Sequence, residues 1–381
     1  MSRLIGARVV GRNAAAPASE VRSWLASVLS DGHEAIGLGD HSAETVVAAA
    51  EAEGVLPLLD WRLRGRRGWE LLPKPLQQRL QGGARQAAMT TLFREREIQR
   101  IAKALADAGA RALLLKGNAL GLWLYPQPYL RVTSDIDLLF SDRMALQQVS
   151  SVLSKIGYSM EPMPGSTIHE MKGRLVIDGG SRCELDVHER LLNAPAYAEI
   201  FSFDELWQGA IDLPSIDVAV KALSPGHAFA HACLNRALDM QVGEPDQLKL
   251  LYDVHLLCKQ MDTASWEAFA ELTRTKRIAG ICLRTLQDAS EAFGSRVPDG
   301  VVDKLGSQAE NEPLDWRELQ NWRYMQWQNL KALPDMRARM SWLWQRVFPT
   351  RQQLHELHGD GNWLQLIWRR FARLLYRVFG R

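Results

Sequence analysis

Cysteine is scarce in this chain, which has only four among its 381 residues. The four are widely separated and none belongs to a CxxC pair: Cys183, Cys233, Cys258 and Cys282. Cysteines scattered in this way argue against a zinc site and against a disulfide framework. A reducing cytoplasm is therefore the location that we expect.

Long hydrophobic runs are also missing. No stretch reaches the roughly 18 consecutive apolar residues that a membrane-spanning helix requires. Residues 1–20 combine basic and small residues without an apolar core of signal-peptide length. The sequence therefore predicts neither secretion nor a membrane span.

Two common catalytic signatures are absent as well. The ALLLKG stretch is not a Walker A loop, because Lys116 lacks the upstream glycine and is not followed by Ser or Thr. No G-x-S-x-G nucleophile elbow occurs in the chain. These absences argue against a P-loop NTPase and against an α/β hydrolase.

The chain has little net charge, only +2, but the charge is unevenly distributed. Residues 313–381 contain twelve basic and five acidic residues, a net +7, which leaves −5 for the remainder. Seven of the thirteen tryptophans lie in the same segment, and WLQLIWRRFARLLYRVFGR has an apolar and an arginine-rich face at helical spacing. Such a helix is typical of proteins that lie on an anionic membrane surface or bind a protein partner.

Two other roles of this basic tail remain open. It can fold back on the helical region with its arginines in solvent, or bind RNA through its charges and rings. Nucleic acid ranks below the other partners because the total charge is close to zero. The sequence thus predicts a cytoplasmic protein with possible peripheral contact to the inner face of the membrane.

The stretch ALLLKGNALGLWLYPQPYLRVTSDIDLLF, residues 112–140, has the most informative pattern. It predicts a buried strand, a tight turn at Lys116-Gly117, a short helix, a loop and a second strand with Asp135 and Asp137. Alternate side chains of a strand share a face, so the two carboxylates lie roughly 6–7 Å apart on one side. This arrangement suits a divalent cation such as Mg²⁺.

A D-x-D pattern alone is more often a solvated strand end than a metal site. Here the neighbouring residues favour the metal site. The Lys116-Gly117 turn opens a helix whose backbone N–H groups can bind phosphate. Lys116 and Arg131 add positive charge on either side of the acidic pair.

A third acid is expected on a strand over Cys183–His188. There Glu184, Asp186 and His188 alternate onto one face, and register alone leaves both acids open. Before it, short strands over 158–163, 168–171 and 175–177, separated at Gly173 and Gly179-Gly180, suggest an antiparallel meander.

These motifs resemble a known superfamily. The order of strand, glycine turn, helix, D-x-D strand and later acid is similar to the nucleotidyltransferases typified by DNA polymerase β. The segments LLLKGNAL, YPQPYLRVTSDIDLLF, Gly157-Tyr158 and ELDVHERL resemble, more narrowly, a bacterial nucleotidyltransferase family that is mostly uncharacterised. The resemblance extends over most of the chain.

The resemblance implies an α+β fold in which helical regions flank a small mixed β-sheet. We expect an N-terminal helical region over 1–87, a nucleotidyltransferase core over 88–215, a helical domain over 216–306 and a basic Trp-rich region over 307–381. Periodicity adds a long amphipathic helix from Met89 to Gly109 that leads into the first strand.

The resemblance also assigns roles to residues. Three acids would hold Mg²⁺ and act in catalysis, with the last as the base: Asp135, Asp137 and Asp186. Five residues would bind the nucleotide: Lys116, Gly117, Asn118, Arg131 and His188. The superfamily commonly has Gly-Ser at the turn, whereas this chain has Gly117-Asn118.

Two further observations concern the helical domain. His227 and His231 have the i, i+4 spacing of metal-binding pairs, but no acidic base lies between them, and helix packing is the favoured role. Asp253 resembles an acid of the family that pins two helices or approaches the nucleotide, and a buried hydrogen bond is the favoured role.

The sequence leads to two functional hypotheses. The first is a Mg²⁺-dependent enzyme that moves a nucleoside monophosphate from an NTP, with ATP the first choice, to a hydroxyl on a small molecule, peptide or protein. The second is an inactive nucleotide-binding scaffold in a membrane-associated biosynthetic or peptide-modifying assembly.

Overall fold

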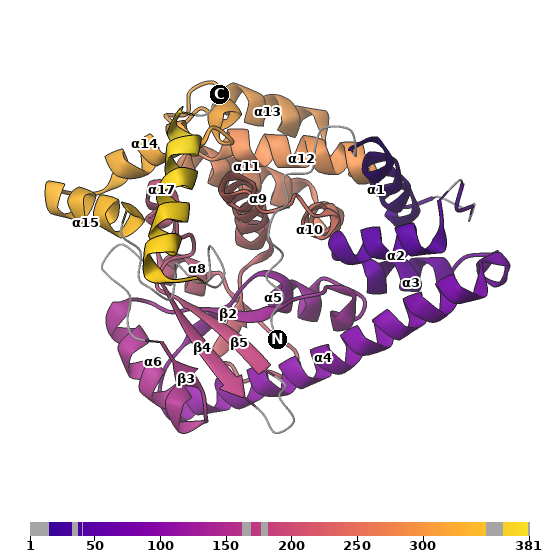
Figure 1. The fold of residues 1–381 in the computed structure, drawn as a ribbon, viewed down its shortest axis with the longest axis horizontal. Coiled ribbons are helices and arrows are strands. Elements are labelled where there is room, and N and C mark those ends of the chain that lie inside the picture. The colour runs from indigo at the N-terminus through magenta and orange to yellow at the C-terminus, as the bar shows by residue number, and fades with distance from the viewer. Residues whose placement is uncertain are drawn as a thin grey trace.

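The computed structural model describes residues 15–32, 37–39, 41–161, 169–176, 182–347 and 361–379. It has the expected α+β architecture, with one mixed sheet flanked by helical regions (Figure 1). The sheet has seven strands in the order β3-β4-β5-β2-β1-β7-β6. Their bounds are β1 Ala112–Leu114, β2 Asp135–Leu139, β3 Ser159–Met160, β4 Glu170–Val176, β5 Arg182–His188, β6 Ile211–Asp212 and β7 Val220–Ala222.

The centre of the sheet combines both strand directions. β2 runs parallel to β5 and antiparallel to β1, whereas β1 runs parallel to β7. The expected antiparallel meander is present as β3, β4 and β5. β6 and β7 were not expected from the sequence, because runs of two or three residues have too few positions to show alternation.

One detail of the meander was predicted wrongly. Gly173 does not separate two strands but lies inside the continuous strand β4, paired with Met160 and Leu185. A Cβ at this position would lie 2.6 Å from the Met160 sulfur, so glycine allows the neighbouring side chain to cross the strand. The predicted turn at Gly179-Gly180 lies outside the described residues.

Two helices cover one face of the sheet, α4 (Lys74–Asp107) and α6 (Arg143–Lys155). Ile136 and Leu138 of β2 point into this layer. Helix α4 is 34 residues long and begins 15 residues before the predicted start at Met89, so it crosses the boundary predicted at residue 87. It packs closely on α3, where a Cβ on Gly83 would overlap the Leu56 side chain.

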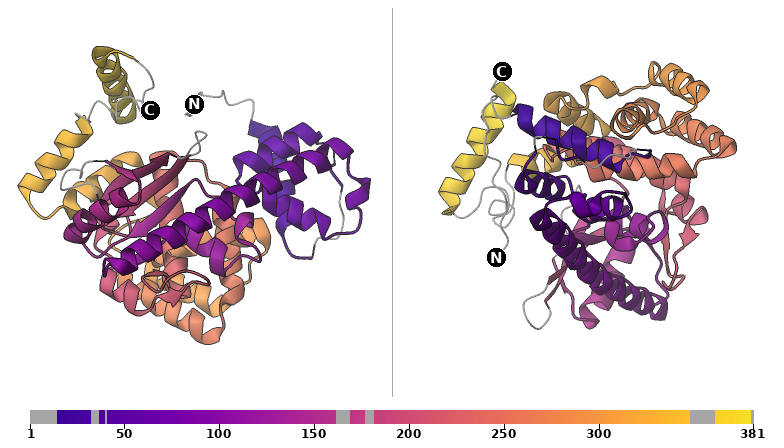
Figure 2. Two further views of the ribbon diagram at one scale, coloured as in Figure 1. Left: turned by 90° about the horizontal axis from the view of Figure 1, so that it is seen from below. Right: turned by 90° about the vertical axis from the view of Figure 1, so that its right-hand side faces the viewer.

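A larger helical layer lies on the other side of the sheet (Figures 1 and 2). Its core joins Leu113 and Leu139 of the sheet to helices from both ends of the chain. These helices are α1 (Ala15–Leu29), α2 (Ala43–Ala52), α3 (Leu56–Arg64), α5 (Lys116–Trp123), α9 (Pro225–Val242), α10 (Leu248–Gln260), α11 (Thr263–Lys276) and α12 (Ala279–Phe293).

Six further α-helices complete the described part of the chain, and four of them follow residue 298. They are α7 (Pro195–Ala198), α8 (Phe203–Gln208), α13 (Asp299–Ala309), α14 (Trp322–Ala332), α15 (Met336–Val347) and α17 (Trp363–Phe379). Among the described residues, no helix combines the length and the apolar character needed to cross a membrane.

His255 makes the stability of the helical layer sensitive to pH. Burial lowers the pKa of His255 from 6.5 to about 4, and the nearby Lys259 charge adds to the effect. Its Nδ1 lies 2.9 Å from the Ser295 hydroxyl, and its Nε2 lies 3.7 Å from Asp31. The unfolded chain therefore takes up the proton first, so this contribution to stability is complete above pH 6.5 and is lost as the pH falls toward 4.

We expect acidification over this range to lower the free energy of unfolding by about 1–2 kcal/mol through His255. Urea unfolding at a series of pH values measures the slope. His255→Gln keeps a hydrogen-bonding side chain without the titration, and its stability should change less between pH 6.5 and 4. An equal slope in wild type and variant would contradict this assignment.

Candidate active site

The parallel pairing of β2 and β5 brings distant acidic residues together. Asp135 pairs with Glu184, Asp137 with Asp186 and Leu139 with His188. Paired residues of parallel strands project to the same side, so these polar side chains share the face that is opposite α4 and α6. Register thus places the D-x-D pair beside the later acidic strand.

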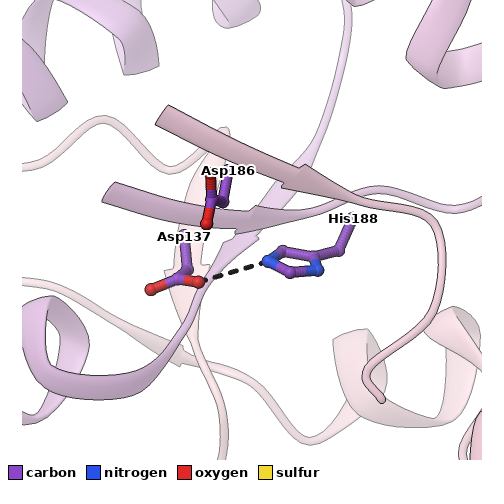
Figure 3. A group of neighbouring side chains, drawn as sticks. All are labelled: Asp137, Asp186 and His188. Atoms are coloured by element: carbon purple, nitrogen blue, oxygen red, sulfur yellow. Dashed lines mark hydrogen bonds and ion pairs between the residues drawn. The ribbon is translucent and has the colours of Figure 1, made fainter. Parts of the chain in front are cut away.

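Three of these side chains form a compact cluster (Figure 3). Ligand atoms of Asp137, Asp186 and His188 all lie within 4.8 Å of one another. Two carboxylates and an imidazole form a donor set that a divalent cation accepts. Asp135 lies one alternate position before Asp137 on the same face, where its carboxylate accepts a 3.0 Å hydrogen bond from the Ser134 hydroxyl.

Asp137 is the most tightly held member of the cluster. Its Oδ1 lies 2.5 Å from Lys116 Nζ and 3.2 Å from His188 Nε2; Asp137 and His188 are buried, and Lys116 is half-buried. Burial alone would raise the pKa of Asp137, but the His188 hydrogen bond and the Lys116 charge outweigh it and hold the pKa at about 2. Asp137 is therefore ionised throughout the physiological range.

Asp186 has the opposite electrostatic environment. Burial raises its pKa to about 7, and the neighbouring charges of Glu170, Asp135 and Asp137 add to the increase. The cluster therefore has more negative charge than Lys116 and His188 balance. A cation placed among these carboxylates would relieve that repulsion.

Glu184, the rival third acid, lies further from the cluster. Its carboxylate makes a 2.9 Å ion pair with Arg174 of β4, and the side chain is more than a third exposed. Asp186 is two positions closer to the end of β5, opposite Asp137. The geometry therefore favours Asp186 over Glu184 as the third acid.

The turn before α5 has the backbone conformation of a tight strand-to-helix connection. Lys116 has φ 51°, in the left-handed region that side chains with a Cβ rarely adopt. This conformation directs the Lys116 ammonium toward Asp137. Asn118 donates a hydrogen bond to the Asp135 carbonyl, and its Oδ1 accepts one from Thr133 at 3.2 Å, so its amide ties α5 to β2.

Comparison with known sequences decides the family. Residues 40–294 match a sequence family described as "Uncharacterised nucleotidyltransferase". The chain belongs to this nucleotidyltransferase family. The match spans the central sheet and most of the helical layer, including every residue of the site described above.

Other comparisons add little to this family assignment. No curated protein matches the chain. A crystal structure of an antigenic nucleotidyltransferase-like protein from Paracoccidioides brasiliensis is similar at 16% sequence identity and a TM-score of 0.32. That similarity covers 54% of this nucleotidyltransferase chain and 94% of the fungal one.

Gly117 of the nucleotidyltransferase is required by close packing. A Cβ at this position would lie 2.5 Å from Thr133 Cγ2 and 2.8 Å from Arg131 Nη1. Neither neighbour has room to retreat, because Thr133 bonds to Asn118 and Arg131 is buried. Gly117 thus lets the loop before β2 lie directly against the first turn of α5.

We expect Gly117→Ala to lower the free energy of unfolding by about 1–3 kcal/mol, the usual cost of overpacking. Thermal and urea unfolding measure this loss. Gly300→Ala, in helix α13, is the matched control because no atom lies within 4 Å of its added methyl group. Equal stability of the two variants would show that the loop before β2 moves to accommodate the methyl group added at position 117.

Arg131 was predicted to bind the nucleotide, and in the structure its guanidinium is engaged by Asp253. Its Nε and Nη2 donate to both oxygens of Asp253 in α10 at 2.7–3.0 Å. The Tyr125 hydroxyl donates to the same carboxylate at 2.7 Å. Asp253 thus has a buried hydrogen-bonding role that joins α10 to the loop between α5 and β2. A contact of Arg131 with nucleotide stays a prediction.

The histidine pair of α9 is divided between two environments. His227 Nδ1 bonds to the N-cap hydroxyl of Ser224 at 2.9 Å. His231 is fully buried and lines a cavity of about 30 Å³ together with Lys116 and Arg131. Burial lowers the pKa of His231 to about 3, and the Lys116 charge reinforces this.

Several residues near the site were missed by the sequence analysis. Arg94 of α4 donates to Thr133 Oγ1 at 2.9 Å and to the Ser134 carbonyl, next to Asp135. Glu170 of β4 lies 3.8 Å from His188 Nδ1. The amphipathic pattern of α4 places Arg94 on the helix but contains no information about the loop that it contacts.

Proposed function

We propose that this protein transfers a nucleoside monophosphate from an NTP to a hydroxyl group of a small molecule, peptide or protein. The acidic cluster beside the Lys116-Gly117 turn is the observation that supports this most strongly. It combines a site for a divalent cation with a helix N-terminus that suits phosphate. ATP is the first NTP to test.

The carboxylate donors support Mg²⁺ as the ion of this proposal. Asp137 and Asp186 supply hard carboxylate oxygens close together, Asp135 lies on the same face, and the negative charge around Asp186 is incompletely balanced. In our proposal these three acids hold the ion. When bound, it would supply positive charge against the triphosphate and the leaving pyrophosphate.

The remaining roles belong to the protein itself. The acceptor hydroxyl attacks the α-phosphate and the bond to pyrophosphate breaks, while Asp186 accepts the hydroxyl proton. A carboxylate within hydrogen-bond reach of the attacking hydroxyl can act as a general base. Lys116 supplies charge at the turn, and His188 holds Asp137 in position by its hydrogen bond.

Isothermal titration with each of the four NTPs, with and without Mg²⁺, tests the proposal. We expect one NTP to bind in a metal-dependent manner to wild type and not to Asp135→Ala/Asp137→Ala. Absence of binding by every NTP to folded wild-type protein would overturn the proposal. Circular dichroism of both proteins confirms that they are folded.

A second candidate is a nucleotide-binding scaffold that does not turn over. The position of Asn118 favours it, because its amide already bonds to Asp135 and Thr133 where the superfamily commonly has a serine that contacts phosphate. Metal-dependent NTP binding without pyrophosphate release, in the presence of candidate acceptors, would favour this role over transfer.

A further inference from the structure

A pocket of about 290 Å³ lies where the N-terminal helices meet α4 and the loop before β2. Helices α2 and α3 form one side of it, the middle of α4 forms another, and α2 and α3 lie beside α4 in Figure 1. Much of the lining is small or apolar, including Leu56, Pro57, Ala87 and Val132. Small-molecule sites occupy roughly 300–1,000 Å³, so a pocket of this size suits a compact ligand.

One wall of this pocket, which we call the α2–α4 pocket, also belongs to the candidate active site. Thr133 lines the pocket, and its hydroxyl donates to Asn118 Oδ1 at 3.2 Å. Arg94 lines the same wall and donates to Thr133 Oγ1 at 2.9 Å and to the Ser134 carbonyl at 3.3 Å. Asp135, the first acid of the D-x-D pair, is the next residue. The pocket therefore lies directly beside the acidic end of β2.

Two half-buried cations border the pocket, and both lie near Asp135. Lys249 of α10 lies against Gly54 at the edge of the pocket, where an added Cβ would be 2.5 Å from the lysine Cδ. Burial lowers the pKa of Arg94 and of Lys249, and the negative charge of Asp135 opposes this shift in both. Neither cation forms an ion pair with a carboxylate of the described residues. Cations without a counter-ion favour an anionic ligand here.

A ligand that satisfies both features has a compact uncharged part and an anionic part. The pocket offers apolar contacts and the Thr91 hydroxyl, which makes no hydrogen bond to a described residue. The nucleoside of an NTP is uncharged and has a ring with polar edges, and its phosphates supply the negative charge. An NTP therefore matches the pocket and the two cations together.

We propose that the α2–α4 pocket holds the base and sugar of the NTP, while the phosphates extend past Arg94 and Lys249 to the acidic cluster. This inference rests on the proposed function and adds where the nucleoside binds. The apolar walls contact the faces of the base, and Thr91 forms a hydrogen bond with its edge. The pocket then discriminates among NTPs, because a base that leaves this hydroxyl unpaired binds less tightly.

Calorimetric titration of the full chain with each NTP and with inorganic tripolyphosphate, all with Mg²⁺, separates the nucleoside from the phosphates. Wild type should bind the preferred NTP more tightly than tripolyphosphate. Ala87→Leu fills part of the pocket and should weaken NTP binding at least about tenfold, with tripolyphosphate binding unchanged. Ala106→Leu, at an exposed position of the same helix outside the pocket, should bind both ligands as wild type does. Unchanged NTP affinity in Ala87→Leu, or equal loss for both ligands, would overturn the proposal.

Two more variants test the wall and the charge without filling the pocket. Thr91→Val keeps the shape of the side chain and should reduce the preference for the tightest NTP over the others about fivefold. Lys249→Met keeps the aliphatic stem and should weaken NTP and tripolyphosphate alike about fivefold. An unchanged preference in the first variant, or unchanged affinities in the second, would contradict the proposal. Thermal midpoints confirm that each variant is folded.

The same titrations distinguish this inference from the proposed function. Folded wild type that binds no NTP would overturn both. NTP affinity that is unchanged in Ala87→Leu, together with slower transfer to an acceptor, would assign the pocket to the acceptor. That result would overturn the nucleoside assignment and leave nucleotidyl transfer supported.

Discussion

Asp137→Asn is expected to lower nucleotidyl transfer at least about a thousandfold, since a buried anion at the centre of the site is lost. The substitution keeps the shape of the side chain but removes the charge that Lys116 and His188 stabilise. Pyrophosphate release from the NTP that binds in titration measures the effect. Undiminished release by the purified variant would rule out a catalytic role for Asp137.

The matched control is Glu184→Gln. Glu184 lies on the same face of the adjacent strand, but it pairs with Arg174 instead of joining the cluster. We expect its activity to stay within about twofold of wild type, because exposed ion pairs contribute little. Equal losses in Glu184→Gln and Asp137→Asn would mean that the general charge of the face matters rather than this cluster.

The second large effect concerns the buried ion pair between Arg131 and Asp253. Asp253→Leu would leave the Arg131 guanidinium buried without its counter-ion. Breaking such a pair costs about 3–5 kcal/mol, far more than the net contribution of an intact pair. Urea unfolding should show a loss of this size.

Two further variants separate the charge from the packing. Arg131→Met/Asp253→Leu removes both charges and should recover most of the lost stability, as apolar replacements of buried pairs commonly do. Tyr125→Phe removes one hydrogen bond to Asp253 and should cost only about 1 kcal/mol. If the double variant is no more stable than Asp253→Leu, cavity formation rather than unpaired charge explains the loss.

The nucleotide affinity of Arg131→Met/Asp253→Leu tests whether Arg131 contacts the nucleotide. Arg131 was assigned to the nucleotide by resemblance, yet its guanidinium is engaged by Asp253 and the Val132 carbonyl. If the stable double variant binds NTP as wild type does, Arg131 positions the loop before β2. A loss of affinity without a loss of stability would instead support direct contact.

The sequence by itself determined the local features of the site. Alternation along a strand places Asp135 and Asp137 on one face, and the same rule applies to Glu184, Asp186 and His188. The turn at Lys116-Gly117 and the strands on either side of it are also local, because they depend on a few consecutive residues. These local patterns were sufficient for the α+β fold and the family to be recognised.

The tertiary structure decided which distant residues meet. Parallel pairing of β2 with β5 selects Asp186 rather than Glu184 as the neighbour of Asp137. The contact between Arg131 and Asp253 joins positions 122 residues apart, and Leu364 and Trp368 of α17 are exposed although the sequence also allows the helix to fold inward. The periodicity of the sequence predicts which face of a helix or strand is apolar, but only tertiary packing determines which residues that face contacts.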